Sequence, residues 1–265
     1  MAFFIYTDEA GWEPDSPRTI VASVIVHADK QILALENHLA ELVRAIPSHL
    51  RGLGPISVKS LWGDTRYRDG WDFPDRKRTI LNIMGVARKA NIPIAFSVVP
   101  RKAILTDISP SDHALIDLHM AIAGVAAKAD KAIRDYGAPT DVGMFIYEDM
   151  GNHHELINHA MNRYRVSPEH MGLAQLYETA EEKRLGYRTQ EGDMRVERIR
   201  GRTLFLKKDD DPLLLLADAA AYGLRRYFND EKFGDEMVDA LLGTCPHKPD
   251  FAEASFTVFY QGTGR

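Results

Sequence analysis

The stretch that decides the fold is residues 3–11, which read FFIYTDEAG, followed by residues 19–27, which read TIVASVIVH. Both runs are rich in β-branched and aromatic residues, a composition typical of buried strands. The residues between them, GWEPDSP, contain Gly and Pro and favour a turn. The sequence therefore predicts an N-terminal β-hairpin, with Asp8 and Glu9 at the end of its first strand.

After this hairpin, segments with apolar residues at helical spacing alternate with short β-favouring runs. This order is typical of one α/β domain with a mixed sheet, here residues 1–265. The polar stretch 166–193 is interpreted as an insertion or lid. Expected helices cover 29–46, 75–90, 111–136, 153–164, 212–228 and 235–242, and expected strands cover 56–61, 92–99, 142–147, 196–206 and 256–260.

The composition excludes several classes of protein. The chain has 265 residues, 45% hydrophobic and 27% charged, which argues against disorder, collagen-like structure and coiled coil. The one cysteine, Cys245, excludes an intramolecular disulfide framework and a Cys-based zinc site. The opening residues lack the features of a signal peptide, and no run reaches the roughly 18 apolar residues of a membrane span. We therefore expect a cytoplasmic protein without a membrane partner.

Acidic residues stand at three places where apolar sequence predicts burial. Asp8 and Glu9 follow FFIYT, Glu148 and Asp149 follow MFIY, and Asp218 lies within PLLLLADAAAYGL. A buried ionised carboxylate is costly unless it is paired, hydrogen-bonded or bound to a metal. The three places together predict one acidic cluster that a divalent cation neutralises. Oxygen ligands favour Mg²⁺ or Mn²⁺, and the chemistry they suit is two-metal phosphoryl transfer.

Each acid also has a simpler interpretation. Strand ends are wet and turns favour Asp, which accounts for the first two places separately. Asp218 shares a helix face with Tyr222 and Arg225, so it could be capped by the tyrosine or paired with Arg225 or Arg226.

A cluster of basic residues predicts a polyanionic ligand. The net charge is −5, which argues against a protein coated with nucleic acid, but residues 195–208 hold six basic residues and one acid. We expect Lys59, Arg198, Arg200 and Arg202 to contact phosphates, which fix the register of a nucleic acid without reading its sequence.

An aromatic group stands among basic residues in the middle of the N-terminal half. Trp62, Tyr67 and Trp71 have Lys59, Arg66 and Arg68 as near neighbours in sequence. The group could stack on unpaired bases, and core packing of the two tryptophans is the alternative.

Three segments together resemble a known family. TDEAG at 7–11, YEDMGN at 147–152 and LLLADAAAYGLRR at 214–226 are similar in order and context to the signatures of the domain-of-unknown-function 3800 family (DUF3800). The resemblance spans roughly residues 3–230. It implies a ribonuclease H-like fold, which has a mixed sheet with an N-terminal hairpin and helices on both faces.

The resemblance also implies site residues. Asp8 matches the acid of the first strand, Glu148 or Asp149 that of the middle strand, with the register favouring Glu148, and Asp218 that of the helix. Two departures stand out: Ala10 replaces the usual Ser, and the segment around 58–62 reads VKSLW where an acid or His is expected. A fourth metal ligand is therefore missing from that segment, and Glu9 is the nearby substitute.

Two functions follow as hypotheses. The first is a nuclease, or a related phosphoryl-transfer hydrolase, with catalytic Asp8, Glu148 and Asp218 and metal ligands that also include Glu9 and Asp149. Its substrate is a nucleic acid, either DNA or RNA. The alternative is a catalytically silent binding module on the same fold, which the acidic net charge and the missing ligand favour.

Overall fold

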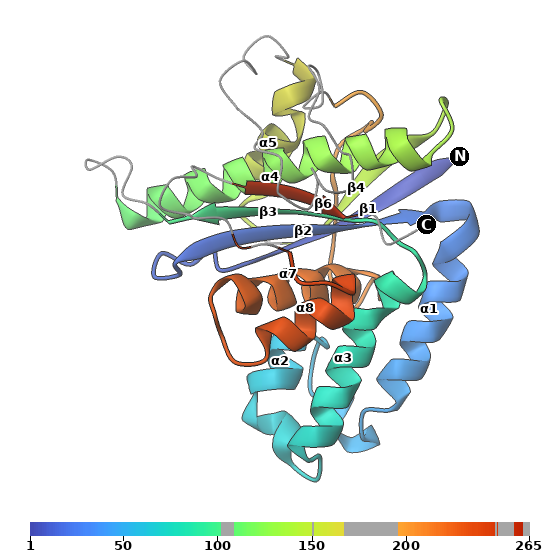
Figure 1. Cartoon of the computed structure of the whole chain (residues 1–265), viewed down its shortest axis with the longest axis vertical. Helices are drawn as coiled ribbons and strands as arrows, with labels where there is room; N and C mark the ends of the chain where they lie inside the picture. Colours follow the sequence, from blue (N-terminus) through green and yellow to red (C-terminus); the bar gives the residue numbers. More distant parts are fainter. Residues whose placement is uncertain (102–108, 150, 167–195, 247, 249–256, 262–265) are drawn as a thin grey trace.

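A six-stranded mixed sheet runs through the middle of the molecule, as the computed structural model of the chain shows (Figure 1). The strand order is β5-β4-β1-β2-β3-β6. Strands β1, β2, β3 and β6 pair antiparallel in succession, whereas β4 runs parallel to β1 and β5 parallel to β4. The strands are β1 (Ala2–Ala10), β2 (Arg18–His27), β3 (Ile94–Pro100), β4 (Val142–Glu148), β5 (Leu204–Leu206) and β6 (Thr257–Gln261).

Helices cover both faces of this sheet, with α4 and α5 on one face and α1, α2, α3, α7 and α8 on the other (Figure 1). The structure describes residues 1–101, 109–149, 151–166, 196–246, 248 and 257–261. Within them the helices are α1 (Ala28–Arg44), α2 (Val58–Gly63), α3 (Phe73–Lys89), α4 (Pro110–Tyr136), α5 (His154–Val166), α7 (Leu214–Phe228) and α8 (Gly234–Leu242), with 3₁₀ turns at Ser48–Leu50 and Thr65–Arg68.

The alternation of side chains along each strand divides the core into two layers. Tyr6 of β1 and Ile146 of β4 belong to the layer beneath α7, whereas Ile5 and Phe145 belong to the layer beneath α4. Residues two apart on a strand share a face, so this assignment also determines where the side chains at the strand ends point.

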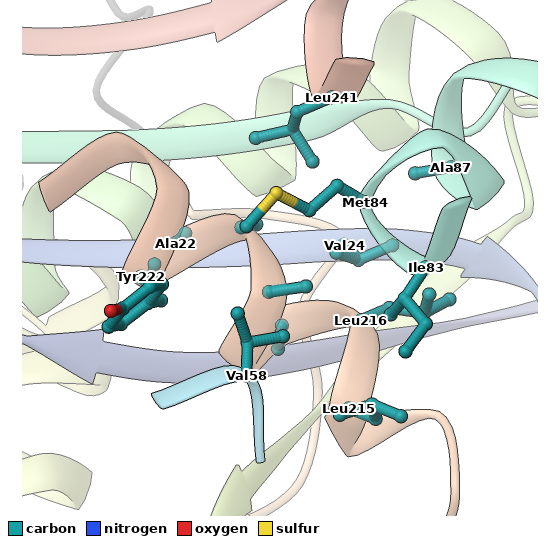
Figure 2. Packing of buried hydrophobic residues seen from close by; sticks show 14 of the residues in the cluster. Ala22, Val24, Val58, Ile83, Met84, Ala87, Leu215, Leu216, Tyr222 and Leu241 are labelled. Carbon is teal, nitrogen blue, oxygen red and sulfur yellow. The ribbon is translucent and has the colours of Figure 1, made fainter. Parts of the chain in front are cut away.

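Helix α7 lies against β1 and β2 in the middle of its layer, and nearly all of its residues are buried. Four of them are alanines, at positions 217 and 219–221, and small side chains let a helix approach a sheet closely. Figure 2 shows how apolar residues of this layer fill the space between α7 and its neighbours in α3, α8, α2 and β2. They are Ala22, Val24, Val58, Ile83, Met84, Ala87, Leu215, Leu216, Tyr222 and Leu241.

Most of the expected elements are confirmed. The hairpin, the alternation of strands and helices, the mixed sheet with helices on both faces and the edge strand near 257–261 are all present. Gly137 ends α4, as expected from its place after the last helical residue. No helix in the described ranges is long and apolar enough to cross a bilayer. The expected insertion at 166–193 falls, apart from its first residue, outside the described residues.

Two expected strands are wrong. Residues 56–61 contain the start of helix α2 instead, because the Ser57 side chain accepts a hydrogen bond from the N–H of Ser60 and caps the first turn. The strand expected at 196–206 is a strand only at Leu204–Leu206, with a single bridge between Ile199 and Gly143 upstream. The short strand β5 pairs parallel with β4.

The close contact between α7 and α8 yields a stability prediction. A Cβ added at Gly234 would lie 2.7 Å from both Cα and N of Tyr227, which are backbone atoms of α7. We expect Gly234→Ala to lower the free energy of unfolding by about 1–3 kcal/mol, because the two helices must separate. Urea unfolding of the purified variant measures this loss.

The matched control is Gly85→Ala within α3, where the nearest atom to the added Cβ is 3.7 Å away. This variant should be neutral or gain up to about 1 kcal/mol from helix propensity. Equal stabilities for the two variants would contradict the packing described here.

Candidate carboxylate and lysine site

The parallel register of β1 and β4 brings two of the predicted acids together. Thr7 pairs with Tyr147, so Asp8 and Glu148 follow side by side at the same end of the two strands. Asp8 is 3% exposed, and its Oδ1 accepts a hydrogen bond from the N–H of Glu9 at 2.8 Å. Because Tyr6 and Ile146 face α7, the side chains two residues further on face α7 as well.

Helix α7, which packs against this face of the sheet, supplies the third acid. Asp218 is 7% exposed, and its Oδ2 accepts a hydrogen bond of 2.6 Å from the backbone N–H of Val58, the first residue of α2. The interpretation that paired Asp218 with Arg225, Arg226 or Tyr222 is wrong. Arg225 and Arg226 instead contact Glu231, and Arg226 donates to the hydroxyl of Tyr222.

A lysine that was not expected in the site lies at the centre of the three carboxylates. The Nζ atom of Lys208 is 2.6 Å from Glu148 Oε2, 2.8 Å from Asp218 Oδ1 and 3.3 Å from Asp8 Oδ2. Its side chain is 12% exposed. The three predicted catalytic acids therefore do converge, and an ammonium group compensates part of their charge.

The end of β5 places Lys208 in this position. Leu206 pairs with Glu148, its carbonyl accepts the N–H of Asp149 at 2.9 Å, and its side chain packs into the layer beneath α7. Lys208 follows two residues later. Its neighbour Lys207 is exposed, and the backbone N–H of Lys207 donates to Asp210 Oδ2 at 3.3 Å, which stabilises the turn.

Asp149, the second candidate at the end of β4, points away from the cluster. Strand alternation turns it toward α5, where its Oδ1 accepts from the N–H of Gly151 at 2.9 Å and contacts His154 Nε2 at 2.7 Å. These bonds hold the pKa of Asp149 below its usual range. The register thus favours Glu148 over Asp149 as the residue of the cluster.

Glu9 lies at the edge of the site. It lines the same cavity as the three acids, and its carboxyl interacts with the hydroxyl of the buried Tyr147. Burial raises the pKa of Glu9 to about 7. Glu9 is therefore placed beside the cluster, but it does not contact Lys208.

Burial dominates the electrostatics of the cluster. It raises the pKa of Asp8, and the neighbouring acids add to the effect while Lys208 opposes it. It likewise raises the pKa of Asp218, against the influence of Lys208 and the N–H of Val58. For Lys208, burial lowers the pKa, but Asp8, Asp218 and Glu148 together raise it further, so the net shift is upward. The ammonium is charged at neutral pH.

The cluster opens into a cavity of about 190 Å³. Its wall includes Lys59, Arg225, Trp12 and Tyr222. Figure 2 shows the position of Tyr222 on α7. Lys59 is 3.8 Å from Glu13, and both are largely exposed. The wall of this cavity therefore carries two cationic side chains, Lys59 and Arg225, as well as the acids.

The other predicted phosphate contacts lie elsewhere. Arg198, Arg200 and Arg202 do not line this cavity, and Arg200 and Arg202 line a separate one of about 10 Å³ beside β4 and α5. The backbone N–H of Arg198 donates to the buried carboxylate of Asp130, which fixes the segment to α4. Of the four expected phosphate-binding residues, only Lys59 is at the site.

The aromatic group is divided between core and surface. Trp71 is 6% exposed and belongs to the core beneath α7, as the packing alternative for the tryptophans expects, and Tyr67 is buried there too. Trp62 is half-buried, with the rings of Phe73 and Phe233 and the guanidinium of Arg226 against it. No stacking surface made of all three residues exists.

The carboxylate oxygens of the cluster suit a positively charged group, but their present spacing is not that of a metal site. No group of three or more Asp, Glu, His or Cys in the described part of the chain is arranged to hold a metal ion. The carboxylates surround Nζ at 2.6–3.3 Å, whereas Mg²⁺ takes oxygen ligands at about 2.1 Å. The carboxylates are nevertheless the hard oxygen donors that Mg²⁺ and Mn²⁺ prefer. The position of Lys208 shows that the centre of the cluster accommodates a positive charge.

Comparisons with known proteins add no identification. No protein-family model, curated protein or solved structure matches the chain at a significant level.

Removal of the ammonium tests its structural role. We expect Lys208→Met to lower the free energy of unfolding by about 3–5 kcal/mol at pH 8 in chelator, because it leaves buried carboxylates unpaired. The loss should shrink at pH 5, where the raised pKa values of Asp8 and Asp218 allow protonation. Chemical denaturation at the two pH values measures both effects.

The matched control is Lys207→Met, since Lys207 is exposed and adjacent in sequence. We expect a change within about 0.5 kcal/mol at both pH values. A similar loss for the two variants would show that Lys208 does not stabilise the cluster.

Glu9 gives the site a predicted pH dependence. Its pKa is raised from an ordinary 4.5 to about 7, so between these values the folded chain binds more protons than the unfolded chain. The contribution of Glu9 to stability is therefore present at low pH and is lost as the pH rises through this window. Glu9→Gln should become more stable than the wild type by up to about 3 kcal/mol from pH 4.5 to pH 8.

Denaturation in chelator across this range measures the difference. Glu13→Gln serves as the control, because the Glu13 side chain is 50% exposed. Its difference from the wild type should stay flat. A flat difference for Glu9→Gln would mean that this carboxyl titrates normally.

Proposed function

We propose that this site binds Mg²⁺ or Mn²⁺ and that the protein is a phosphoryl-transfer hydrolase, specifically a nuclease. One observation carries the proposal. Asp8, Glu148 and Asp218 come from three separate elements and converge on one positive charge at the wall of a cavity. Like charges are brought together at a cost in free energy, and such an arrangement is a common feature of catalytic sites.

The topology supports the fold that the proposal needs. A mixed sheet with an N-terminal hairpin, parallel β4 and β5 and helices on both faces agrees with what the resemblance to the DUF3800 family implies. We accordingly propose a ribonuclease H-like fold and membership of that family. Fold alone does not select the reaction, so the functional argument depends on the site.

The residues of the chain have separate roles in this proposal. Asp8, Glu148 and Asp218 hold the cation, with Glu9 as the adjacent carboxylate. The divalent ion supplies activation of water and stabilisation of the leaving oxygen. Lys59 and Arg225 on the cavity wall attract and orient the phosphates of a nucleic acid. The N–H of Val58 fixes the orientation of the Asp218 carboxylate.

A cleavage assay tests the proposal. Fluorescently labelled single-stranded and duplex DNA and RNA are incubated with the protein in Mg²⁺, Mn²⁺ or EDTA. We expect cleavage that needs the divalent ion and that falls at least ~100-fold in Asp8→Asn and in Asp218→Asn, since each removes charge that stabilises the ion.

Asp149→Asn is the matched control, because its carboxylate contacts Gly151 and His154 instead of Lys208. It should retain wild-type cleavage. Cleavage that persists in EDTA, or that is unchanged in Asp218→Asn, would defeat the assignment.

The second candidate is a catalytically silent binding module. It is favoured by Lys208 itself, because an ammonium already pairs with all three carboxylates without a metal ion. In that case the wild type, folded and supplied with Mn²⁺, cleaves none of the four substrates. The same assay therefore distinguishes the two functions.

A further inference from the structure

Three aromatic side chains gather beside the cavity, on helices that lie on the same side of the sheet (Figure 1). The ring centroid of Trp62 on α2 lies 5.2 Å from that of Phe73, the first residue of α3, and 5.5 Å from that of Phe233, which precedes α8. The centroids of Phe73 and Phe233 are 5.8 Å apart. These three residues form what we call the aromatic cluster.

The aromatic cluster reaches the surface of the protein. Phe73 is 38% exposed, and the guanidinium of the buried Arg76 lies 5.7 Å from the centroid of its ring, so the opposite face of the ring is the one that solvent reaches. Phe233 has a φ of 69°, a left-handed conformation that is unfavourable for a bulky side chain. Such conformations are concentrated at functional positions, including those that hold ligands.

The aromatic cluster adjoins the cavity. Lys59 of the cavity wall and Trp62 are three residues apart on α2 and are therefore neighbours on its surface. The guanidinium of Arg226 lies 4.8 Å from the ring centroid of Trp62 and 5.6 Å from that of Tyr222, another residue of the wall. The cavity wall and the aromatic cluster are thus adjacent parts of one surface.

Cationic side chains accompany the rings. The Nζ atoms of Lys77 and Lys232 lie 4.2 Å and 4.8 Å from the ring centroid of Phe233. Lys77 is paired with Glu236, whereas Lys232 is exposed. At the cavity, the side chain of Lys59 is 74% exposed. Aromatic rings next to exposed cations are the combination that binds unpaired bases together with their phosphates.

The depth of the acids limits the form of nucleic acid that can reach them. Asp8 and Asp218 are 3% and 7% exposed, and the cavity beside them measures about 190 Å³. A duplex is stiff over many base pairs and keeps its bases paired inside, so it does not fold into a hollow of this size. The backbone of a single strand is flexible, and its bases are free to turn outward and stack on aromatic side chains.

We propose that the substrate is a single-stranded nucleic acid, with its backbone in the cavity and its unpaired bases stacked on the aromatic cluster. The inference rests on the proposed function, which makes the substrate a nucleic acid, but it needs no divalent ion, because the rings and lysines bind in its absence. Every base has a π face, so stacking selects unpaired strands without selecting a sequence. Phe73, the most exposed of the three rings, is the residue that determines this specificity.

Fluorescence anisotropy with the full chain in EDTA tests the proposal. The probes are a labelled strand of about 12 nucleotides, as DNA and as RNA, and the matching duplexes. For the polymer that binds more tightly, we expect the wild type to bind the single strand at least ~10-fold tighter than the duplex. Phe73→Ala should weaken single-strand binding about 10-fold, the loss of one stacked base, and leave duplex binding unchanged. Phe73→Tyr keeps the ring and should retain wild-type affinity.

The matched control is Tyr136→Ala, which removes a 47% exposed aromatic side chain from α4, on the other face of the sheet. It should bind both forms as the wild type does. Salt dependence separates stacking from phosphate contacts. The slope of log K against log[salt] should be unchanged in Phe73→Ala and smaller in magnitude by about 0.7 in Lys232→Ala. Circular dichroism monitors the folding of each variant.

Equal affinity of the wild type for the two forms, or unchanged affinity of a folded Phe73→Ala variant, would overturn the inference. The first comparison uses the wild type and does not depend on a variant that folds. Sedimentation tests whether a second copy of the chain covers the rings instead, and a dimer that Phe73→Ala abolishes would also overturn the inference.

The same samples in Mg²⁺ separate this inference from the proposed function. Metal-dependent cleavage of the duplex as fast as the single strand would overturn the inference and leave the proposed function intact. Single-strand binding that depends on Phe73, without cleavage in Mg²⁺ or Mn²⁺, would overturn the proposed function and leave the bound form of nucleic acid as inferred.

Discussion

The ion contacts of Lys208 with Asp8, Glu148 and Asp218 are the constraint on which the arrangement of the site depends. They tie together the ends of β1 and β4, the middle of α7 and the turn after β5. Burying any one of these carboxylates alone is costly, and burying them side by side is more so. The ammonium group of Lys208 lowers the free-energy cost of bringing these carboxylates together at neutral pH. The sheet and the site are therefore coupled, since the strand pairing delivers both the acids and the cation that compensates them.

Strand register decides which acids take part. The sequences FIYTD and FIYED look alike and invite a match of Asp8 with Asp149, but Thr7 pairs with Tyr147 and brings Asp8 beside Glu148. A displacement of one residue turns a side chain to the opposite face of a sheet. Asp149 consequently meets His154 of α5 on the far face. The selection of the cluster is a property of the sheet, and the local chemistry of the acids plays little part in it.

Features that depend on local sequence patterns are predicted well. Apolar runs around Asp8, Glu148 and Asp218 indicated burial, and the hairpin and most helices followed from periodicity. Lys208 was missed because it ends a basic run in which Lys207, its neighbour, is exposed; nothing in the run distinguishes the two. The partners proposed for Asp218 were one or two helical turns away on the same helix, whereas the actual partners come from α2 and from the turn after β5. Long-range pairing of this kind is decided by tertiary packing, which a local pattern does not contain.

The spacing of the carboxylates constrains how an ammonium and a metal ion could share them. Oxygens at 2.6–3.3 Å from Nζ form a wider cage than the ligands of Mg²⁺, which lie at about 2.1 Å. An ion at the centre of this cage would therefore have to expel Lys208 and draw three elements inward, against close-packed neighbours. An ion beside the cage needs no such contraction, provided that it finds another oxygen. Glu9 is the next carboxyl along the wall of the cavity, where it also interacts with the hydroxyl of Tyr147. The central ammonium therefore leaves no place for an ion in the middle of the cage, and the divalent ion proposed above would have to lie beside Lys208.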